Sequence, residues 1–421
     1  MKKYLLMLCV LFCGIKAMTH PMPSSVVKLS VLDKSIHGEA KIPLIELANA
    51  VGEQHIANLN DPFVKTYFTN HIKVTSPGST WSTQVERITV LTDKDPVIGS
   101  YQEIVVRFTL TPSDPRYLRT FTFNYDAVIH QVVTHSALVY VSRDWSNGIH
   151  DENNARQIGI IHMDVPSGKL FPLKINLDEG SWWRGFKSML SLGMQHIKEG
   201  TDHLLFLIVL LLPAMLLTNG KQWGKSGDLK YSLLRLLKIV TAFTIGHSIT
   251  LLIGALGLLK LPGQPVEILI AVSILVSAIH AIHPMFPGKE TFIAASFGLI
   301  HGLAFAAVLS DLQLTAGKLA LSVLGFNLGI EIMQLFVIAL IAPWLILLSK
   351  TAAYKWLRVA GATLAGIAAL AWIIQRTTGT ANFVTGCVEA VAGYGAWVIA
   401  GLATASLVVY SATLFANKKL L

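Results

Sequence analysis

The sequence predicts a multi-domain membrane protein, in which an exported antiparallel β-sandwich domain precedes an α-helical transmembrane bundle of about seven helices. Two observations lead to this fold class. Residues 20–180 carry regularly spaced charges, turns and alternating apolar positions, as soluble β domains do. From about residue 190 onward, long apolar runs are separated by short polar loops, which is typical of a polytopic membrane domain.

The first residues, 1–17, have the layout of a secretory signal peptide. Lys2 and Lys3 precede an apolar run that ends near the small residue Ala17. We expect cleavage after Ala17, and an uncleaved membrane anchor is the alternative. A signal of this kind places the domain formed by residues 18–180 outside the cytoplasmic membrane, in the periplasm.

Cysteine usage and the expected mature terminus restrict the metal chemistry. Two of the three cysteines lie in the signal, so that Cys387 alone remains, without a partner for a disulfide or a thiolate cluster. Any metal site must therefore use His, Asp, Glu, Asn, Met or the terminal amine. Cleavage after Ala17 would expose Met18-Thr19-His20, and an X-X-His terminus of this kind binds Cu(II) or Ni(II). His20 is therefore a secondary candidate ligand.

The exported domain is expected to consist mainly of strands. Several stretches alternate apolar and polar residues with a period of two and are rich in β-branched residues, among them SSVVKLSVLD, QVERITVLTD, YQEIVVRFTL and HSALVYVSRD. Such repeated short strands with turns between them predict an antiparallel sandwich. We expect a short helix around PLIELANAVG to interrupt it.

The helical domain, residues 181–421, contains seven candidate spans. Each is close to or above the length of about 20 apolar residues that crossing a bilayer requires. Trp182 and Trp183, just before the first span, are expected at the level of the lipid headgroups. The spans cover residues 189–217, 237–259, 266–285, 291–310, 319–349, 356–375 and 385–415.

Loop charges indicate how the spans are oriented. With residues 18–180 outside, eleven Lys and Arg residues fall in cytoplasmic loops and the tail, and three fall in external loops. This asymmetry follows the positive-inside rule and predicts a multi-pass protein of the cytoplasmic (inner) membrane. The formal net charge of +9 therefore reflects orientation in the membrane, and we expect lipid rather than nucleic acid as the partner.

The stretch GMQHIKEGTDHLLFLIVLLL, residues 193–212, places ionisable side chains at the start of the first span. His196 and His203 are seven residues apart and would share one face of a continuous helix, with Glu199 between them and Asp202 to one side. A charged side chain near the bilayer centre costs about 2.5–3.5 kcal/mol, and such residues usually serve a function. A single histidine is better explained by a hydrogen bond to a neighbouring helix, whereas the cluster favours a metal site.

Other spans carry polar residues at similar depth. His247 lies near the middle of the second span and His301 near the middle of the fourth. The fifth span places Asn327, Glu331 and Gln334 on one helix face at i, i+4 and i+7. Simple residue counting brings His203, His247, His301 and Glu331 together, which predicts a polar pathway or metal site enclosed by helices.

A second, weaker candidate lies at the cytoplasmic end of the third span. His280 and His283 are three residues apart just before a proline. They are candidates for an exit site, although histidines at an interface are common.

The motif GxxHIxxGxDHLLFL, together with FTIGHSITL, FGLIHGLAFA and FNLGIEIMQ, resembles the HupE/UreJ family of hydrogenase and urease accessory membrane proteins. The likeness covers roughly residues 185–350, and HPMPSSVVKLSV and IPLIEL are similar to the exported domain of one branch of the family. The resemblance implies a polytopic nickel or cobalt permease. It implies that the motif positions are His196, Asp202 and His203, and that further polar positions of the family are His247, His301, Asn327 and Glu331.

The leading hypothesis is therefore a permease for a divalent transition-metal ion. The ion is cargo rather than a permanent cofactor; nickel or cobalt is expected, and copper or zinc also suits imidazole donors. We expect no enzymatic activity, because neither an HExxH nor a GxSxG element is present. Two alternatives remain open, an assembly or sensor protein whose exported domain binds a protein partner, and a membrane-embedded metalloenzyme.

Overall fold

A computed structural model describes residues 23–56, 62–95, 99–150, 154–259, 261–310 and 312–418. The expected signal peptide and His20 lie outside these residues. The chain divides into two compact units, an amino-terminal unit that reaches Glu179 and a helical unit that begins at Gly180, with Ser146–Gly148 grouped with the second.

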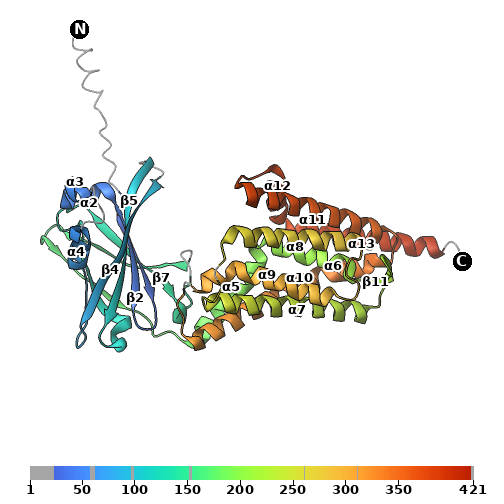
Figure 1. The fold of residues 1–421 in the computed structure, drawn as a ribbon, viewed down its shortest axis with the longest axis horizontal. Helices are drawn as coiled ribbons and strands as arrows, with labels where there is room; N and C mark the ends of the chain where they lie inside the picture. The colour runs from blue at the N-terminus through green and yellow to red at the C-terminus, as the bar shows by residue number, and fades with distance from the viewer. Residues whose placement is uncertain are drawn as a thin grey trace, which may run out of the picture. The chain divides into compact units, whose positions relative to one another are not determined.

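The amino-terminal unit is built on two sheets (Figure 1). The larger has seven strands in the order β4-β5-β2-β1-β7-β8-β9, and the smaller has three in the order β10-β6-β3. The strands are β1 (Ser25–Val31), β2 (Ile36–Pro43), β3 (Ile72–Thr75), β4 (Trp81–Asp95), β5 (Gly99–Pro112), β6 (Thr120–Tyr125), β7 (Ser136–Asp144), β8 (Arg156–Asp164), β9 (Lys169–Leu170) and β10 (Leu173–Asn176).

The larger sheet is mixed, whereas the sequence predicted antiparallel pairing throughout. Strands β1 and β7 run parallel, with Val27 opposite Val139. The other pairs in both sheets are antiparallel. The period-two alternation of apolar residues is the same in parallel and antiparallel strands, so it carries no information on direction.

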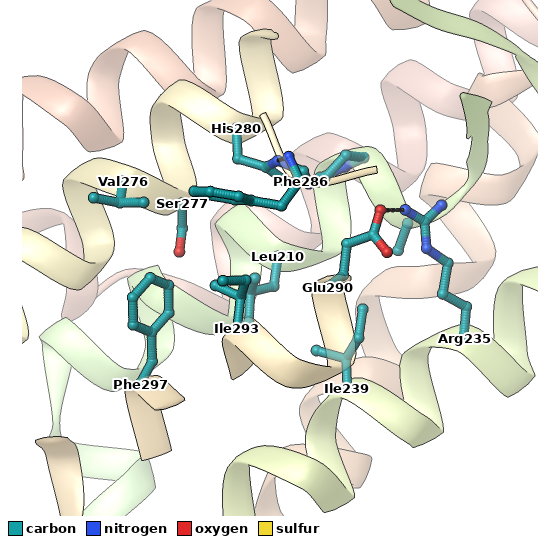
Figure 2. Close-up of a pocket in the computed structure, with 12 residues that line it drawn as sticks. Leu210, Arg235, Ile239, Val276, Ser277, His280, Phe286, Glu290, Ile293 and Phe297 are labelled. Atoms are coloured by element: carbon teal, nitrogen blue, oxygen red, sulfur yellow. Dashed lines mark hydrogen bonds and ion pairs between the residues drawn. The ribbon is translucent and has the colours of Figure 1, made fainter. Parts of the chain in front are cut away.

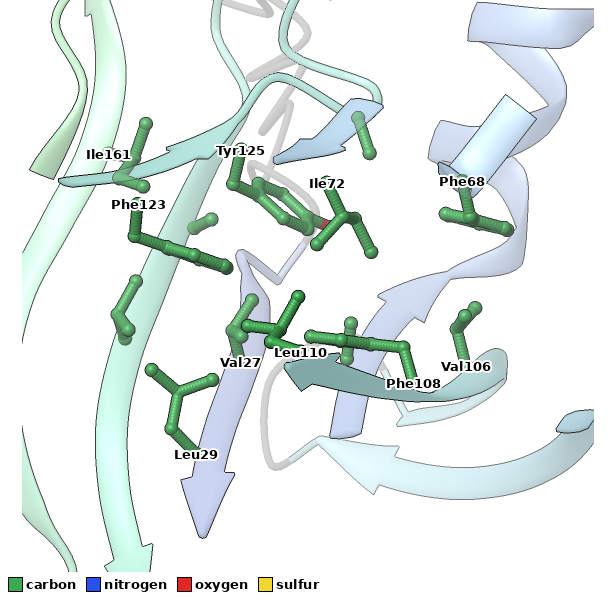
Figure 3. Close-up of a cluster of buried hydrophobic side chains, with 14 of the residues drawn as sticks. Val27, Leu29, Phe68, Ile72, Val106, Phe108, Leu110, Phe123, Tyr125 and Ile161 are labelled. Carbon is green, nitrogen blue, oxygen red and sulfur yellow. The ribbon is translucent and has the colours of Figure 1, made fainter. Parts of the chain in front are cut away.

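The two sheets share one hydrophobic core. Figure 3 shows Phe123 and Tyr125 of the small sheet facing Val27, Phe108 and Leu110 of the large one. The alternating burial of β1 and β2 explains this arrangement, because every second side chain of each strand enters the core. Three helices lie between strands, α2 (Leu44–Val51), α3 (Glu53–Ile56) and α4 (Pro62–His71). The first of them is the helix expected around PLIELANAVG.

The second unit is an α-helical bundle in which several helices run alongside one another (Figure 1). A hairpin of β11 (Leu216–Asn219) and β12 (Gln222–Ser226) connects two of them. The helices are α5 (Trp182–Glu199), α6 (Thr201–Ala214), α7 (Leu229–Ala255), α8 (Gly263–Ile282), α9 (Glu290–Ser310), α10 (Ala316–Ser349), α11 (Ala353–Thr378), α12 (Phe383–Ala392) and α13 (Gly395–Lys418).

Within the described residues, five helices are long and apolar enough to cross a membrane, where the sequence predicted about seven spans. They are α7, α8, α10, α11 and α13; the other apolar helical stretches found are shorter, and they are Thr201–Ala214, Glu290–Ala306 and Phe383–Ala392. Five such helices make this a multi-pass membrane protein, and the total of about seven spans stays a prediction.

Two of the expected spans are broken helices. The first, 189–217, ends its first helix at Glu199 and starts the second at Thr201, because Gly200 has an extended ψ of 90°. The last, 385–415, is interrupted near Gly393 between α12 and α13. Each break falls at or near a glycine, where helix propensity is lowest among residues other than proline.

Glycines allow the bundle helices to pack backbone against backbone. A Cβ atom added at Gly193 of α5 would overlap the Phe326 carbonyl of α10, and one at Gly298 of α9 would overlap the Phe243 carbonyl of α7. A Cβ at Gly302 would overlap the His247 carbonyl in the same way. Small residues permit this close approach in membrane proteins, and here it brings the polar side chains of neighbouring helices together.

Candidate metal centre

The break at Gly200 brings two histidines together. His196 lies in the last turn of α5 and His203 in the first turn of α6, and their ring centroids are 4.6 Å apart. The sequence predicted one face of a continuous helix, and the structure achieves the contact by the break instead. A Cβ on Gly200 would lie 2.7 Å from the His196 carbonyl oxygen and 2.9 Å from His203 Nδ1, so the absence of a side chain here lets the two residues approach.

Two further helices add their histidines to this pair. The ring of His301, from α9, is 5.0 Å from that of His203, and the ring of His247, from α7, is 6.3 Å from that of His196. His247 and His301 are fully buried, and His203 is 6% exposed. The structure thus gathers four predicted histidines into one group within the bundle.

A carboxylate fixes the tautomer of His203. Its Nδ1 lies 2.9 Å from Asp202 Oδ1. An ionised carboxylate only accepts hydrogen bonds, so Nδ1 carries the proton and Nε2 carries the lone pair. The other oxygen of Asp202 accepts from Arg376 Nη2 at 3.1 Å, and Arg376 Nη1 also donates to the Glu267 carbonyl. Asp202 is therefore held between an imidazole and a guanidinium.

An amide does the same for His247. His247 Nδ1 lies 3.0 Å from Asn327 Oδ1. The Asn327 amide nitrogen donates to the Val323 carbonyl at 2.8 Å, which fixes the orientation of the amide with its oxygen toward the ring. His247 must then donate from Nδ1, and the lone pair is on Nε2.

A serine sets the opposite tautomer for His301. Ser273 Oγ donates to the Ile270 carbonyl at 2.7 Å, and it lies 2.9 Å from His301 Nε2. Because the hydroxyl proton is used by the carbonyl, the oxygen accepts from Nε2–H. The lone pair of His301 is therefore on Nδ1.

The nitrogens assigned a lone pair are the ones that lack a partner. Within the described residues, Nε2 of His203, Nε2 of His247 and Nδ1 of His301 are buried without a hydrogen bond, and so is Nε2 of His196. Leaving a buried acceptor unpaired costs about 1–3 kcal/mol. Imidazoles held by a second partner with the free nitrogen turned inward are the arrangement that metal-binding histidines adopt.

The histidine group is not a closed coordination sphere. Across the described part of the chain, no three His, Cys, Asp or Glu side chains are arranged so that they hold a metal ion. Binding by several of these imidazoles therefore requires small ring rotations or helix shifts.

Phenylalanines enclose the histidines on two sides. Phe305 and Phe326 stack with ring centroids 4.3 Å apart, and both contact His196. Phe206 and Phe243 each lie 5.1 Å from His301. Neighbours of this kind exclude water and leave the imidazoles without competing donors.

Three of the predicted site residues on α5 and α10 lie outside this group. Glu331 accepts a hydrogen bond from Thr241 at 2.8 Å, and Gln334 accepts one from Thr244 at 3.4 Å, so both connect α10 to α7. Glu199 is exposed and accepts from Gln195. Residue counting placed Glu331 on the correct face of α10, but among the described interactions Glu331 makes no contact with an imidazole. Asn327, one turn earlier on the same face, contacts His247.

A small cavity lies where α7 and α9 begin and α8 ends, with a volume of about 20 Å³. Figure 2 shows His280 and Phe286 beside the ion pair of Arg235 and Glu290, whose Nη2–Oε1 distance is 2.6 Å. His280 Nδ1 accepts from the backbone N–H of Met285, so its unpaired Nε2 is a proton donor.

In this tautomer Nε2 of His280 carries a proton, whereas a nitrogen that binds a metal needs a lone pair. His283, the second member of the pair predicted as an exit site, is exposed. The structure therefore separates the two histidines, one buried beside the cavity and the other at the surface.

Sequence reasoning predicted Asp202 and Asn327 but missed two other residues, Ser273, which orients His301, and Arg376, which holds Asp202. Arg376 is one of the three positive charges assigned to external loops, and no sequence pattern marks Ser273. Ser273 is a common small residue in an apolar helix, and only its distance to His301 marks it. Arg376 could have been singled out from its position at the end of an apolar span, because a buried charge in a membrane helix requires a partner.

The fold and this group of residues define a class, a multi-pass helical membrane protein with inward-facing imidazoles suited to a borderline divalent ion. Residues 173–376 match the family model described as HupE / UreJ protein. Residues 173–376, which hold the histidine group, therefore match the HupE/UreJ family, a family of nickel- and cobalt-related accessory or transport membrane proteins. No curated protein and no solved structure matches the chain.

Proposed function

We propose that this protein is a permease for a divalent transition-metal ion, with nickel or cobalt as the cargo. The observation that carries the proposal is the set of three imidazoles whose tautomers are fixed by Asp202, Asn327 and Ser273, so that each turns an unshared lone pair away from its partner. Neutral imidazole is a donor that suits nickel and other borderline divalent ions.

The proposed orientation places the amino-terminal unit outside the inner membrane. In that orientation α8 begins and α11 ends on the outer side, so Asp202, Arg376 and Glu267 lie at the entry to the histidines. An entering cation would compete with the Arg376 guanidinium for the Asp202 carboxylate. Such competition admits a cation only when the guanidinium moves aside.

The proposed route continues past the aromatic side chains. Phe206 contacts both His301 and Phe297, and Phe297 lines the cavity near the opposite end of the bundle. An ion leaving the imidazoles in this direction must displace Phe206 or Phe243. Rotation of these rings is then the inner gate of the transport cycle.

The test is cellular accumulation of a panel of divalent metals in a host that lacks its own nickel and cobalt importers. Wild type, the double variant Asp202→Ala, His203→Ala, and the control His162→Ala are compared at matched membrane expression. The control removes an exposed imidazole of β8, outside the bundle. We expect one metal to accumulate with wild type and His162→Ala and to be lost with the double variant.

Equal accumulation in all three proteins would refute transport through this site and would favour an assembly or sensor protein. A stoichiometric metal retained through purification, with no accumulation in cells, would favour the metalloenzyme instead. The same metal panel distinguishes nickel, cobalt, copper and zinc.

A further inference from the structure

A second pair of histidines lies in the amino-terminal unit, outside the residues matched by the family model. His71 ends α4, and His130 lies in the turn after β6. The register of β3 on β6 sets Ile72 opposite Tyr125, and the Asp126 N–H donates to the His71 carbonyl at 3.2 Å. This pairing of strand ends brings the two histidines to the same residue, Asp126.

Both imidazoles donate from Nδ1 to Asp126. His71 Nδ1 lies 2.7 Å from the carboxylate Oδ1, and His130 Nδ1 lies 3.0 Å from the backbone carbonyl. Carboxylate and carbonyl oxygens only accept, so each ring keeps its lone pair on Nε2. The two rings stack with centroids 4.3 Å apart and an interplanar angle of 18°. Their Nε2 atoms are therefore on ring edges turned away from Asp126.

The turn that carries His130 is held in an unusual conformation. Val128 has a φ of 70°, a value that β-branched residues rarely adopt, and its side chain is fully buried. Its N–H donates to the Tyr67 hydroxyl at 2.9 Å, and the Tyr67 ring lies 4.4 Å from the His71 ring. Strained backbone of this kind persists where the surroundings fix it and is concentrated at functional sites.

The pair is reachable from solvent, unlike the buried His203, His247 and His301 of the bundle. The His71 side chain is 22% exposed and the Asp126 side chain 44%. A solvent-reachable imidazole pair, with each ring oriented by a hydrogen bond from its other nitrogen, has the two features of an exchangeable metal site.

We propose that His71 and His130 bind a divalent transition-metal ion through their Nε2 atoms, with water completing the coordination. Asp126 acts as the positioning residue, because it orients both rings without using its own oxygens on the ion. The lone pair of each ring lies in the ring plane, so the two stacked rings share one ion when they tilt and their Nε2 edges move toward each other. This site is independent of the intramembrane histidines, and its test does not depend on transport.

The experiment measures Ni(II) binding to the purified full chain in detergent by equilibrium dialysis and metal analysis. Every protein carries His20→Asn, so that an X-X-His terminus cannot contribute. His71→Asn, His130→Asn and Asp126→Asn are compared with His162→Asn, which removes an exposed imidazole of the same unit. We expect the His162→Asn variant to bind one more Ni(II) per chain than the His71→Asn and His130→Asn variants. Asp126→Asn should weaken Ni(II) binding at this site by about 10–100-fold.

Equal Ni(II) stoichiometry in the His71→Asn, His130→Asn and His162→Asn variants would overturn the proposal. Because the two substitutions remove packed rings, a second measurement uses the His20→Asn chain with no further change. Ni(II) should protect His71 and His130, but not His162, from carbethoxylation mapped by mass spectrometry. Modification of all three at the same rate with and without Ni(II) would equally overturn it.

Discussion

At the scale of single residues, the site depends on the hydrogen bond that one ring nitrogen of His203, His247 and His301 makes, because this bond leaves the lone pair on the other nitrogen. Asp202, Asn327 and Ser273 belong to three different helices, yet each accepts the N–H of one histidine. The bonds to Asn327 and Ser273 are defined in turn by backbone carbonyls of their own helices. Helix geometry thus fixes which nitrogen of His247 and of His301 is available to an ion.

A serine substitution tests this control directly. Ser273→Ala removes the acceptor for His301 Nε2–H and frees the ring to change tautomer, so metal affinity should fall by about 10–100-fold. Ser277→Ala is the matched control, because Ser277 is also buried on α8 and also donates to a backbone carbonyl, but makes no hydrogen bond to an imidazole among the described residues. The measurement is the metal concentration that gives half-maximal uptake in the importer-deficient host. Equal values for the two variants would show that the hydroxyl does not orient a ligand.

At the scale of elements, the site exists because helices approach closely and one of them is broken. Gly246 on α7 and Gly298 and Gly302 on α9 let the two backbones touch next to His247 and His301. Gly200 ends α5 and lets α6 start with Asp202 in its first turn. A carboxylate is stabilised there by the positive end of the helix dipole.

The close packing of α7 and α9 predicts a cost for a single methyl group. Gly298→Ala places a Cβ against the Phe243 carbonyl, a backbone atom that cannot turn aside, and should destabilise the bundle by about 1–3 kcal/mol. Gly401→Ala in α13 is the control, because a Cβ there meets nothing within 4 Å; it should be neutral or slightly stabilising.

Thermal unfolding of both proteins in the same detergent measures this difference. A melting temperature for Gly298→Ala equal to that of Gly401→Ala would mean that α7 and α9 are not packed as closely as described.

The identity of the site residues could be predicted from the sequence more readily than the backbone geometry that brings them together. The apolar pattern and family motif pointed to His196, Asp202, His203, His247 and His301, and the structure brings them together. The break at Gly200 and the parallel pairing of β1 with β7 were not predictable. Periodicity reports burial of a face, and it does not report where a backbone stops being helical or which way a strand runs.

The whole molecule combines two units with separate hydrophobic cores, one between the sheets and others within the bundle. Their stabilities should therefore respond separately to pH. In the amino-terminal unit, His135 is 4% exposed, and burial lowers its pKa to about 4. Its neutral ring lies 2.7 Å from Ser25 Oγ and 3.4 Å from Glu46.

The sign of the effect follows from which state takes up the proton. Above pH 6.5 His135 is neutral in both states, and its contribution to stability is complete. Between pH 6.5 and about 4 the unfolded chain binds a proton that the folded unit excludes, so the free energy of unfolding should fall by about 3 kcal/mol as the pH drops. Burial raises the pKa of Glu46, which acts in the opposite direction. A variant is therefore needed to isolate the histidine.

His135→Gln removes the titrating group and keeps a side chain able to hydrogen-bond Ser25. Hydrogen exchange of peptides from β1 and β7, measured on the full chain in detergent between pH 4 and 7 and corrected for intrinsic exchange rates, reports the stability of this unit alone. Wild type should lose protection as the pH falls through this range, and His135→Gln should lose about 3 kcal/mol less. Peptides from α7 and α9 serve as the internal comparison, because the bundle lacks His135 and should give the same result in both proteins. Parallel profiles for β1 in wild type and variant would mean that His135 already carries its proton in the folded unit, and the buried neutral ring would then be the wrong description of this core.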